Sequence, residues 1–273
     1  MGTAHVNNID VHYEVHGAGE PLLLIMGLGA NATAWEMQVA AFSPQFQVIA
    51  YDNRGAGRSD KPNEPYSMAQ MAGDAAGLLD HLGIASAHVF GMSMGGMIAQ
   101  ELVLRHPDRV QALILGGTMA GGLGAVMAGP QLMQQWARLA TMPPAQAVEA
   151  GLTFLYSDEF LSQNKDRLVQ RALQTVHLMP PPYALQRQAM AVIGFNAYDR
   201  LQDIRSPTLV LTGTADKIVP AENSRVLAGR IPGATLLEFP GAGHGFLVEK
   251  AAETNAAVLG FLRAHGRPSA GPK

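Results

Sequence analysis

Two kinds of hydrophobic pattern alternate along the chain. Residues Ile9–His16 switch between apolar and polar side chains at each step, which predicts an antiparallel strand with one exposed face. The later strands are expected at short continuous apolar runs, which are typical of parallel strands covered on both faces. These runs are Leu22–Met26, Val48–Tyr51, His88–Phe90, Ala112–Leu115 and Thr208–Leu211, and a further strand is expected at Thr235–Phe239.

Helical spacing of apolar residues fills the intervals between these runs. Met68–Leu82 repeats apolar residues every three or four positions, which predicts a helix with one buried face. A second helix, Met94–Arg105, is expected to end before Pro107, which cannot continue it. Helices are also expected at Trp35–Phe42 and Ala251–Ala264. Strands that alternate with helices form βαβ units, so the fold class is α/β with a mostly parallel, doubly wound sheet.

The alternation stops in one long segment, 118–199. The segment begins with a glycine-rich stretch, and clusters of proline divide it into short helical patterns such as Gln131–Ala140 and Asp166–Thr175. We interpret 118–199 as a helical cap inserted into a core made of 1–117 and 200–273. A cap of this kind is expected to control substrate choice without contributing catalytic side chains.

Composition narrows the class of partner. The chain has 273 residues, 48% of them hydrophobic and 15% charged, which is typical of a globular protein with a full core. Its net charge of −3, without a cluster of lysine or arginine, argues against a nucleic-acid partner. The absence of cysteine excludes disulfides, thiolate metal sites and a cysteine nucleophile. With no H-E-x-x-H or similar spacing, neither a metal nor a cofactor is expected.

The sequence also suggests a location. The first ten residues lack a basic region followed by an apolar run, so no signal peptide is visible. The longest apolar runs, such as Pro21–Met26, are far shorter than the ~20 residues that span a bilayer. We therefore expect a cytoplasmic protein with no membrane partner.

The most specific motif is Gly91-Met92-Ser93-Met94-Gly95. It follows the predicted strand His88–Phe90 and opens a predicted helix, which is the context of a strained turn that projects a serine hydroxyl above a sheet. Small residues are needed on both sides of Ser93 because the backbone crowds itself there. The motif predicts Ser93 as a nucleophile.

A serine hydroxyl needs a base, and the base needs a carboxylate that orients it. Asp216 in GTAD and His244 in GAGH each follow one of the last two predicted strands, in the order acid then histidine. Asp203 and Asp199 are rival carboxylates, but both precede the strand that leads to Asp216. We therefore expect Ser93, Asp216 and His244 to form a catalytic triad.

Acyl transfer also requires donors for a developing oxyanion. One is expected to be the backbone N–H of Met94, directly after the nucleophile. The second is expected from the loop Gly27-Leu28-Gly29, and we choose the N–H of Leu28.

A substrate pocket is predicted from flexible and aromatic side chains. The chain contains 14 methionines, and those close to the motifs suit an adaptable apolar pocket as well as ordinary core packing. The candidates from the core and the cap are Met26, Met92, Met119, Trp136, Phe154 and Tyr183.

With these motifs, the chain resembles the α/β-hydrolase superfamily along nearly its whole length. Residues 51–59 resemble the family's D-x-R-G-x-G-x-S loop, and 106–110 resemble its H-P-x-R-V helix exit. One departure is Met26-Gly27, where the family usually has His-Gly, so a side chain that often braces the oxyanion loop is missing. The resemblance implies an α/β-hydrolase fold and is strongest to small esterases, enol-lactonases, methylesterases and cofactor-free haloperoxidases.

Together these observations predict a serine hydrolase that cleaves a carboxylic ester or lactone of a small, largely apolar substrate. A perhydrolase or haloperoxidase and a C–C bond hydrolase use the same triad and stay open as alternatives. A non-catalytic ligand receptor and a dinucleotide-dependent oxidoreductase are more remote. The last is suggested by Gly27-x-Gly29-x-x-Ala32 with Asp52 about 20 residues on, although Asp52 and Arg54 also suit a purely structural role.

Overall fold

The computed structural model describes residues 1–139 and 141–266 and contains one eight-stranded sheet. The strand order is β1-β2-β4-β3-β5-β6-β7-β8. The bounds are β1 Gly2–Val6, β2 Ile9–His16, β3 Glu20–Ile25, β4 Phe46–Tyr51, β5 Ala87–Met92, β6 Val110–Gly116, β7 Thr208–Gly213 and β8 Thr235–Phe239. β1 and β2 pair antiparallel to their neighbours, and the strands from β3 to β8 are parallel.

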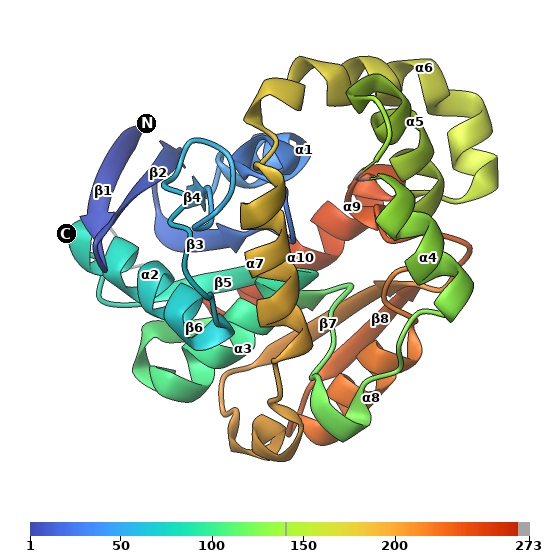
Figure 1. Ribbon diagram of the computed structural model, residues 1–273. Coiled ribbons are helices and arrows are strands. Elements are labelled where there is room, and N and C mark those ends of the chain that lie inside the picture. The colour runs from blue at the N-terminus through green and yellow to red at the C-terminus, as the bar shows by residue number, and fades with distance from the viewer. Residues whose placement is uncertain (140, 267–273) are drawn as a thin grey trace.

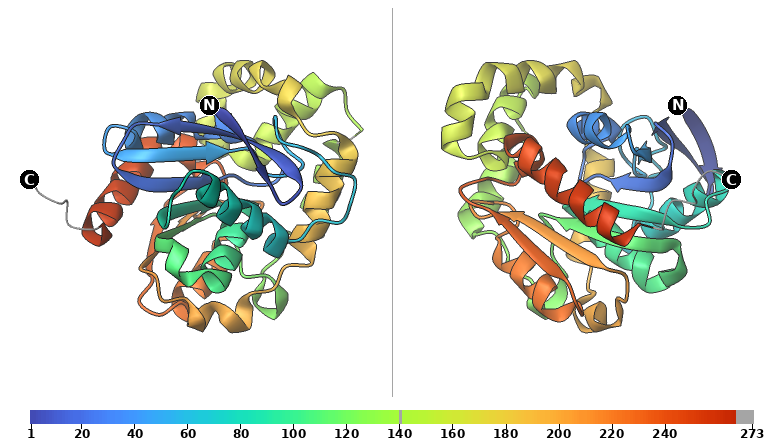
Figure 2. Two further views of the ribbon diagram at one scale, coloured as in Figure 1. Left: turned by 90° about the vertical axis from the view of Figure 1, so that its left-hand side faces the viewer. Right: turned by 180° about the vertical axis from the view of Figure 1, so that it is seen from behind.

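Helices cover both faces of this sheet (Figures 1 and 2). The layers are α1 (Glu36–Phe42) and α10 (Ala251–His265) on one face, and α2 (Met68–His81), α3 (Met94–Arg105) and α8 (Glu222–Arg230) on the other. Successive strand residues supply the two cores in turn, because side chains of a strand alternate between faces. In β3, Leu23 and Ile25 pack with the α2 and α3 layer, whereas Leu22 and Leu24 pack with the α1 and α10 layer. The predicted doubly wound α/β fold is therefore confirmed.

The first strand was not expected from the sequence. β1 joins β2 through Asn7 and Asn8, whose φ angles of 47° and 62° lie in the left-handed region that asparagine tolerates. Only Ala4 and Val6 of β1 face the core. A five-residue strand with two inward side chains gives too weak an alternation to be recognised.

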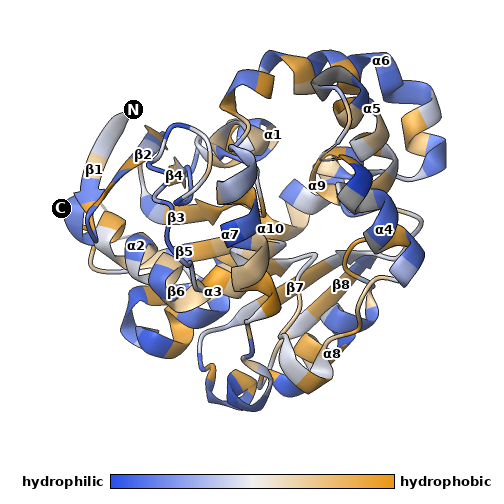
Figure 3. Ribbon diagram, in the orientation of Figure 1, coloured by the Kyte–Doolittle hydropathy of each residue, from blue (hydrophilic) through white to orange (hydrophobic). Residues whose placement is uncertain are grey.

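In the described part of the cap segment there are four α-helices. They are α4 (Pro130–Leu139), α5 (Pro144–Leu155), α6 (Asp158–Gln174) and α7 (Pro182–Ile193), with the short 3-10 turns η3 (Gly122–Gly124) and η4 (Val176–Leu178). α5 and α6 form an arch, while α7 crosses in front of the central strands (Figure 1). Most of α6 is hydrophilic, whereas the central strand β3 is mostly hydrophobic (Figure 3).

The two ends of this segment meet. Gly121 forms an antiparallel bridge with Asn196, and the Ala197 N–H donates to the Ala120 carbonyl at 2.8 Å. This pairing supports our interpretation of 118–199 as an insertion, which stays a prediction. Within the described residues, no helix combines the length and the apolar character needed to cross a membrane.

Candidate active site

Ser93 lies between β5 and α3 in a strained turn. Its φ of 57° and ψ of −123° place a residue with a side chain in a region that usually favours glycine. The turn needs its small neighbours: a Cβ on Gly96 would lie 2.6 Å from the Thr118 side chain, and one on Gly91 or Gly95 would strike backbone atoms. Ser93 itself is only half-buried. The turn therefore fixes the direction in which the Ser93 side chain leaves the backbone and keeps this side chain partly accessible.

Asp216 and His244 are in direct contact. His244 Nδ1 lies 2.7 Å from Asp216 Oδ2, and both residues are buried. The second carboxylate oxygen, Oδ1, accepts the backbone N–H groups of Ile218 at 2.9 Å and Val219 at 2.8 Å. Because an ionised carboxylate only accepts hydrogen bonds, it favours the His244 tautomer with a proton on Nδ1, which leaves Nε2 free to accept a proton.

The loops that carry these two side chains are joined by their backbones. The Ala215 N–H donates to the Ala242 carbonyl at 2.9 Å, and the Thr214 N–H donates to the Phe239 carbonyl, at the end of β8, at 3.0 Å. These bonds link the loop after β7 to the loop after β8. They hold the Asp216–His244 contact in place independently of the side chains.

Ser93 and His244 both approach the end of β6. The Ser93 N–H donates to the Gly116 carbonyl at 2.8 Å. A Cβ on the next residue, Gly117, would lie 3.3 Å from His244 Cε1. Since β5, β6, β7 and β8 are parallel, their carboxyl ends share one edge of the sheet, and Ser93, Asp216 and His244 all follow strands that end at this edge.

The predicted oxyanion loop lies directly against Ser93. A Cβ on Gly27 would be 2.9 Å from Ser93 Cβ and 3.3 Å from Ser93 Oγ. Within the part of the chain that the structure describes, the N–H groups of Leu28 and Met94 donate no hydrogen bond to another protein group. Both are therefore available to an oxygen held beside Ser93.

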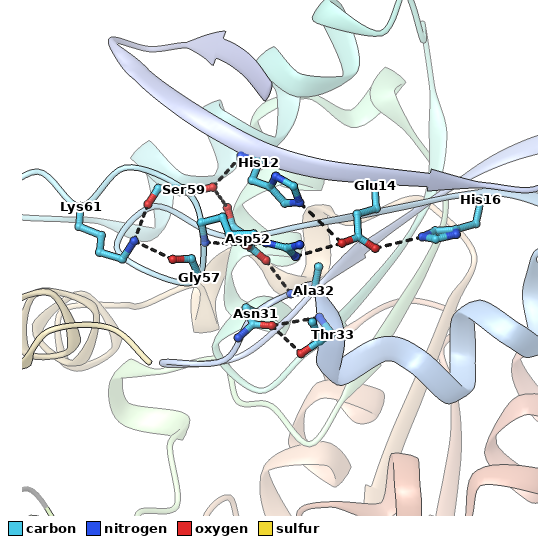
Figure 4. Close-up of polar contacts among 11 residues, drawn as sticks. His12, Glu14, His16, Asn31, Ala32, Thr33, Asp52, Gly57, Ser59 and Lys61 are labelled. Atoms are coloured by element: carbon cyan, nitrogen blue, oxygen red, sulfur yellow. Dashed lines mark hydrogen bonds and ion pairs between the residues drawn. The ribbon is translucent and has the colours of Figure 1, made fainter. Parts of the chain in front are cut away.

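Asp52 has a structural role in the loops around this site. Its Oδ1 accepts the Ala32 N–H at 2.7 Å, and its Oδ2 accepts the Arg58 N–H at 2.7 Å (Figure 4). Asp52 is fully buried. Because both oxygens are occupied inside the protein, neither is left for a ribose hydroxyl, so the structural interpretation of Asp52 is confirmed.

Arg54 is also a structural residue. Its Nε and Nη2 donate to the two oxygens of Asp74 at 2.6 and 2.8 Å, and both side chains are nearly fully buried. Burial alone lowers the pKa of the Arg54 guanidinium, but the hydrogen bonds and charge of Asp74 outweigh it and raise that pKa. Arg54 therefore stays charged as half of a buried ion pair.

The candidate pocket residues occupy different environments. Met26, Met92 and Met119 are buried, and the Met92 methyl group lies 2.9 Å from the Cβ position of Gly117, beside His244. Phe154 lines a groove of about 320 Å³ between α4 and α5. Tyr183 is 39% exposed, and its hydroxyl donates to the Lys61 carbonyl at 2.8 Å.

Trp136 belongs to α4, but its side chain lies outside the described residues. The rival carboxylates Asp199 and Asp203 are exposed in the 3-10 helix η5 (Tyr198–Asp203). Neither is part of the buried contact that Asp216 makes with His244.

Two residues that the sequence did not indicate connect the cap to these loops. Gln188 of α7 accepts the Gly29 N–H at 2.8 Å. Glu249 of α9 (Phe246–Glu249) accepts the Gly243 N–H at 3.0 Å, next to His244, and also the hydroxyl of Ser157 in the cap. The only local signal for Gln188 is a polar residue in the buried stripe formed with Ala184 and Ala191. Both contacts connect the cap to loops that carry candidate site residues.

The chain is similar to known hydrolases. It matches the family model of the alpha/beta hydrolase fold over residues 20–251. A relative from Azorhizobium caulinodans, named "Putative carbamate hydrolase RutD", is 35% identical over 261 residues, which are 96% of this chain and 98% of the relative.

Two solved structures are similar along the whole chain. The enol-lactonase from Burkholderia xenovorans LB400 is 30% identical with a TM-score of 0.84, and the match covers 96% of this chain and 100% of that chain. The thermophilic esterase from Thermogutta terrifontis is 28% identical with a TM-score of 0.84, and the match covers 97% of this chain and 99% of that chain.

Proposed function

The chain belongs to the alpha/beta hydrolase fold family, and we propose that it is a serine hydrolase that cleaves a carboxylic ester or lactone. The observation that carries this proposal is the buried 2.7 Å contact between His244 Nδ1 and Asp216 Oδ2 at the sheet edge where Ser93 lies in its strained turn. The similarity to an enol-lactonase and an esterase supports the same reaction class.

In the proposed reaction, Ser93 Oγ attacks the substrate carbonyl carbon while His244 Nε2 accepts the hydroxyl proton. The carbonyl oxygen becomes an oxyanion, and the N–H groups of Leu28 and Met94 donate to it. His244 then returns the proton to the departing alcohol oxygen, which leaves an acyl group on Ser93. Water, deprotonated by the same imidazole, releases the carboxylic acid and restores the serine.

The surroundings of the site favour a small, largely apolar substrate. Met26 and Met92 are buried on one face of the sheet and Met119 on the other, close to the loops that carry the candidate triad. Methionine side chains are flexible and polarizable, so they fit apolar groups of different shapes. The cap helices lie over this region and are the proposed determinants of chain length and shape, with Trp136, Phe154 and Tyr183 as candidate contacts.

A substrate screen tests the proposal. Purified protein is incubated with p-nitrophenyl esters of increasing acyl length and with lactones, and Ser93→Ala is the matched control. We expect hydrolysis by the natural protein and a loss of several orders of magnitude in kcat for Ser93→Ala, because triad members act as a unit. Equal hydrolysis by both proteins would contradict the assignment of Ser93.

A carbamate is the second candidate substrate class. It is favoured by the 35% identity to the relative named as a carbamate hydrolase. The same triad suits both classes, since a carbamate also presents a carbonyl to Ser93 and forms a carbamoyl-enzyme instead of an acyl-enzyme. Aryl carbamates in the same screen distinguish the two: a kcat/KM above that of every ester would make the carbamate the preferred class.

A further inference from the structure

Gln188 joins the cap to the loops beneath it. This side chain projects from α7 and is fully buried. Its Oε1 accepts the Gly29 N–H at 2.8 Å, and its Nε2 donates to the Arg54 carbonyl at 2.8 Å. One amide therefore satisfies a backbone donor in the oxyanion loop and a backbone acceptor in the neighbouring loop. Both loops are more than a hundred residues away from Gln188 in the chain.

These bonds restrict the peptide group that carries the Leu28 N–H. A peptide unit is planar, so a hydrogen bond to either end fixes the orientation of the whole plane. Asn53 Nδ2 donates to the Met26 carbonyl at 2.8 Å, which fixes the plane before Gly27. Gln188 fixes the plane after Leu28 through the Gly29 N–H. The Gly27–Leu28 plane lies between these two fixed neighbours.

The loop needs such support because of its own composition. Gly27 and Gly29 flank Leu28, and Gly29 has a φ of +71°. Glycine rotates more freely than any other residue, so the Leu28 N–H could turn away from Ser93 at little cost. Among the described residues, the one backbone bond to that peptide group runs from the Ala30 N–H to the Gly27 carbonyl, and it is long at 3.3 Å. The side chain at position 26 is a thioether and offers no hydrogen-bond donor.

We propose that Gln188 is a positioning residue that aims the Leu28 N–H at the oxyanion and couples the seating of α7 to catalysis. The inference rests on the proposed function, since it requires an oxyanion beside Ser93. α7 packs closely here as well, because a Cβ on Gly29 would lie 2.9 Å from Leu185 Cδ1. A displacement of α7 away from the core therefore removes both the lid over the site and the brace of its oxyanion loop.

Gln188→Met tests this role. Methionine keeps the length and volume of the side chain but makes neither hydrogen bond. We expect kcat to fall about 10- to 100-fold, below the roughly 10²- to 10³-fold loss from deleting an oxyanion donor. KM for the same ester is expected to change much less, because the loss lies in the transition state.

The rates are expressed per active site titrated with a phosphonate, so that misfolded protein does not count. A trifluoromethyl ketone, which forms an oxyanion on Ser93, is expected to bind more weakly by the same factor as kcat. A purely structural Gln188 would lower only the fraction of titratable sites, and kcat per site and ketone affinity would then equal those of the natural protein. That result overturns the proposal.

Gln111→Met is the matched control. Gln111 Nε2 also makes two hydrogen bonds, to the carbonyl and hydroxyl of Ser86 at 3.2 and 2.9 Å. It lies at the amino end of β6, the opposite end of the sheet from Ser93. We expect this variant to lose some stability and to keep its kcat per site. A fall in its kcat equal to that of Gln188→Met would also overturn the proposal.

Gln188→Glu keeps the test decisive if the methionine variant does not fold. The protonated carboxyl can accept from the Gly29 N–H and donate to the Arg54 carbonyl, whereas the ionised form repels that carbonyl oxygen. The nearby Arg54–Asp74 pair influences the pH at which this carboxyl ionises, but it does not alter which of the two forms makes both hydrogen bonds. Its kcat relative to the natural protein is expected to fall as pH rises, and a constant ratio overturns the proposal. If the natural protein shows no Ser93-dependent hydrolysis at all, the proposed function fails as well.

Discussion

Gly27→Ala tests how closely the oxyanion loop must approach Ser93. Gly27 is buried, and its φ lies outside the left-handed region, so alanine adds a steric effect without backbone strain. The new Cβ would be 2.9 Å from Ser93 Cβ. Ordinary carbon contacts are about 3.5–4.0 Å, so the loop and the serine must separate by about 0.6–1.1 Å.

This separation sets the expected magnitudes. Overpacking of a close contact costs about 1–3 kcal/mol of unfolding free energy. A displacement near 1 Å at reacting groups lowers the rate by up to about 10²-fold. We therefore expect kcat for a p-nitrophenyl ester to fall about 10- to 100-fold, with a smaller change in KM because the apolar contacts of the substrate remain.

The assay compares kcat per titrated active site with the urea midpoint of unfolding. Gly260→Ala is the matched control, because Gly260 lies in α10 and its Cβ position has no described atom within 4 Å apart from its chain neighbours and the backbone of its own helix. It is expected to keep its kcat and to gain about 0.5–1 kcal/mol of stability, since alanine favours helix more than glycine does. A Gly27→Ala protein with wild-type kcat per site would refute the argument that this loop supplies a donor beside Ser93.

Three further predictions concern the structure around the site. Arg54→Met should destabilise the fold by about 3–5 kcal/mol because it leaves Asp74 buried without its partner, and adding Asp74→Leu should restore much of that loss in urea unfolding. Burial lowers the pKa of His88, so the folded protein resists a proton that the unfolded chain binds below about pH 6.5. The stability that neutral His88 allows is therefore present above that pH and lost as pH falls. In His88→Leu, the urea midpoint of unfolding should depend less on pH between pH 7 and 5. Asp216→Asn should lower kcat about 10⁴-fold with the fold retained, because the wrong His244 tautomer is then favoured; near-natural activity in this variant would point to a different acid.

The candidate triad, which stays a prediction, could be chosen from the sequence because each member follows a strand with a clear local pattern. Ser93 comes directly after β5, Asp216 and His244 lie in the loops that follow β7 and β8, and parallel strands end at one edge of the sheet. The glycines on both sides of Ser93 are required by contacts with nearby backbone atoms and with Thr118, so they also mark the turn in the sequence. The local sequence pattern and the order of the strands thus both indicate the same edge of the sheet for the candidate site.

The contacts of the cap could not be predicted in this way. Gln188 meets Gly29 across 159 positions of sequence, and no local periodicity encodes that pairing. Tyr183 is proposed for the pocket from its aromatic character, which gave no sign that its hydroxyl also donates to the Lys61 carbonyl. Which cap side chains face the core depends on how the helices pack, and that packing is set by the whole fold.

Covalent labelling of Ser93 is the most direct test of the account. The natural protein is treated with a fluorophosphonate, digested, and mapped by mass spectrometry alongside Ser93→Ala and Asp216→Asn. We expect a single adduct on Ser93, its absence in Ser93→Ala, and a much slower reaction in Asp216→Asn, because His244 then loses the partner that orients it. An adduct on any other residue, or hydrolysis that survives in Ser93→Ala, would contradict the assignment of Ser93 as the nucleophile.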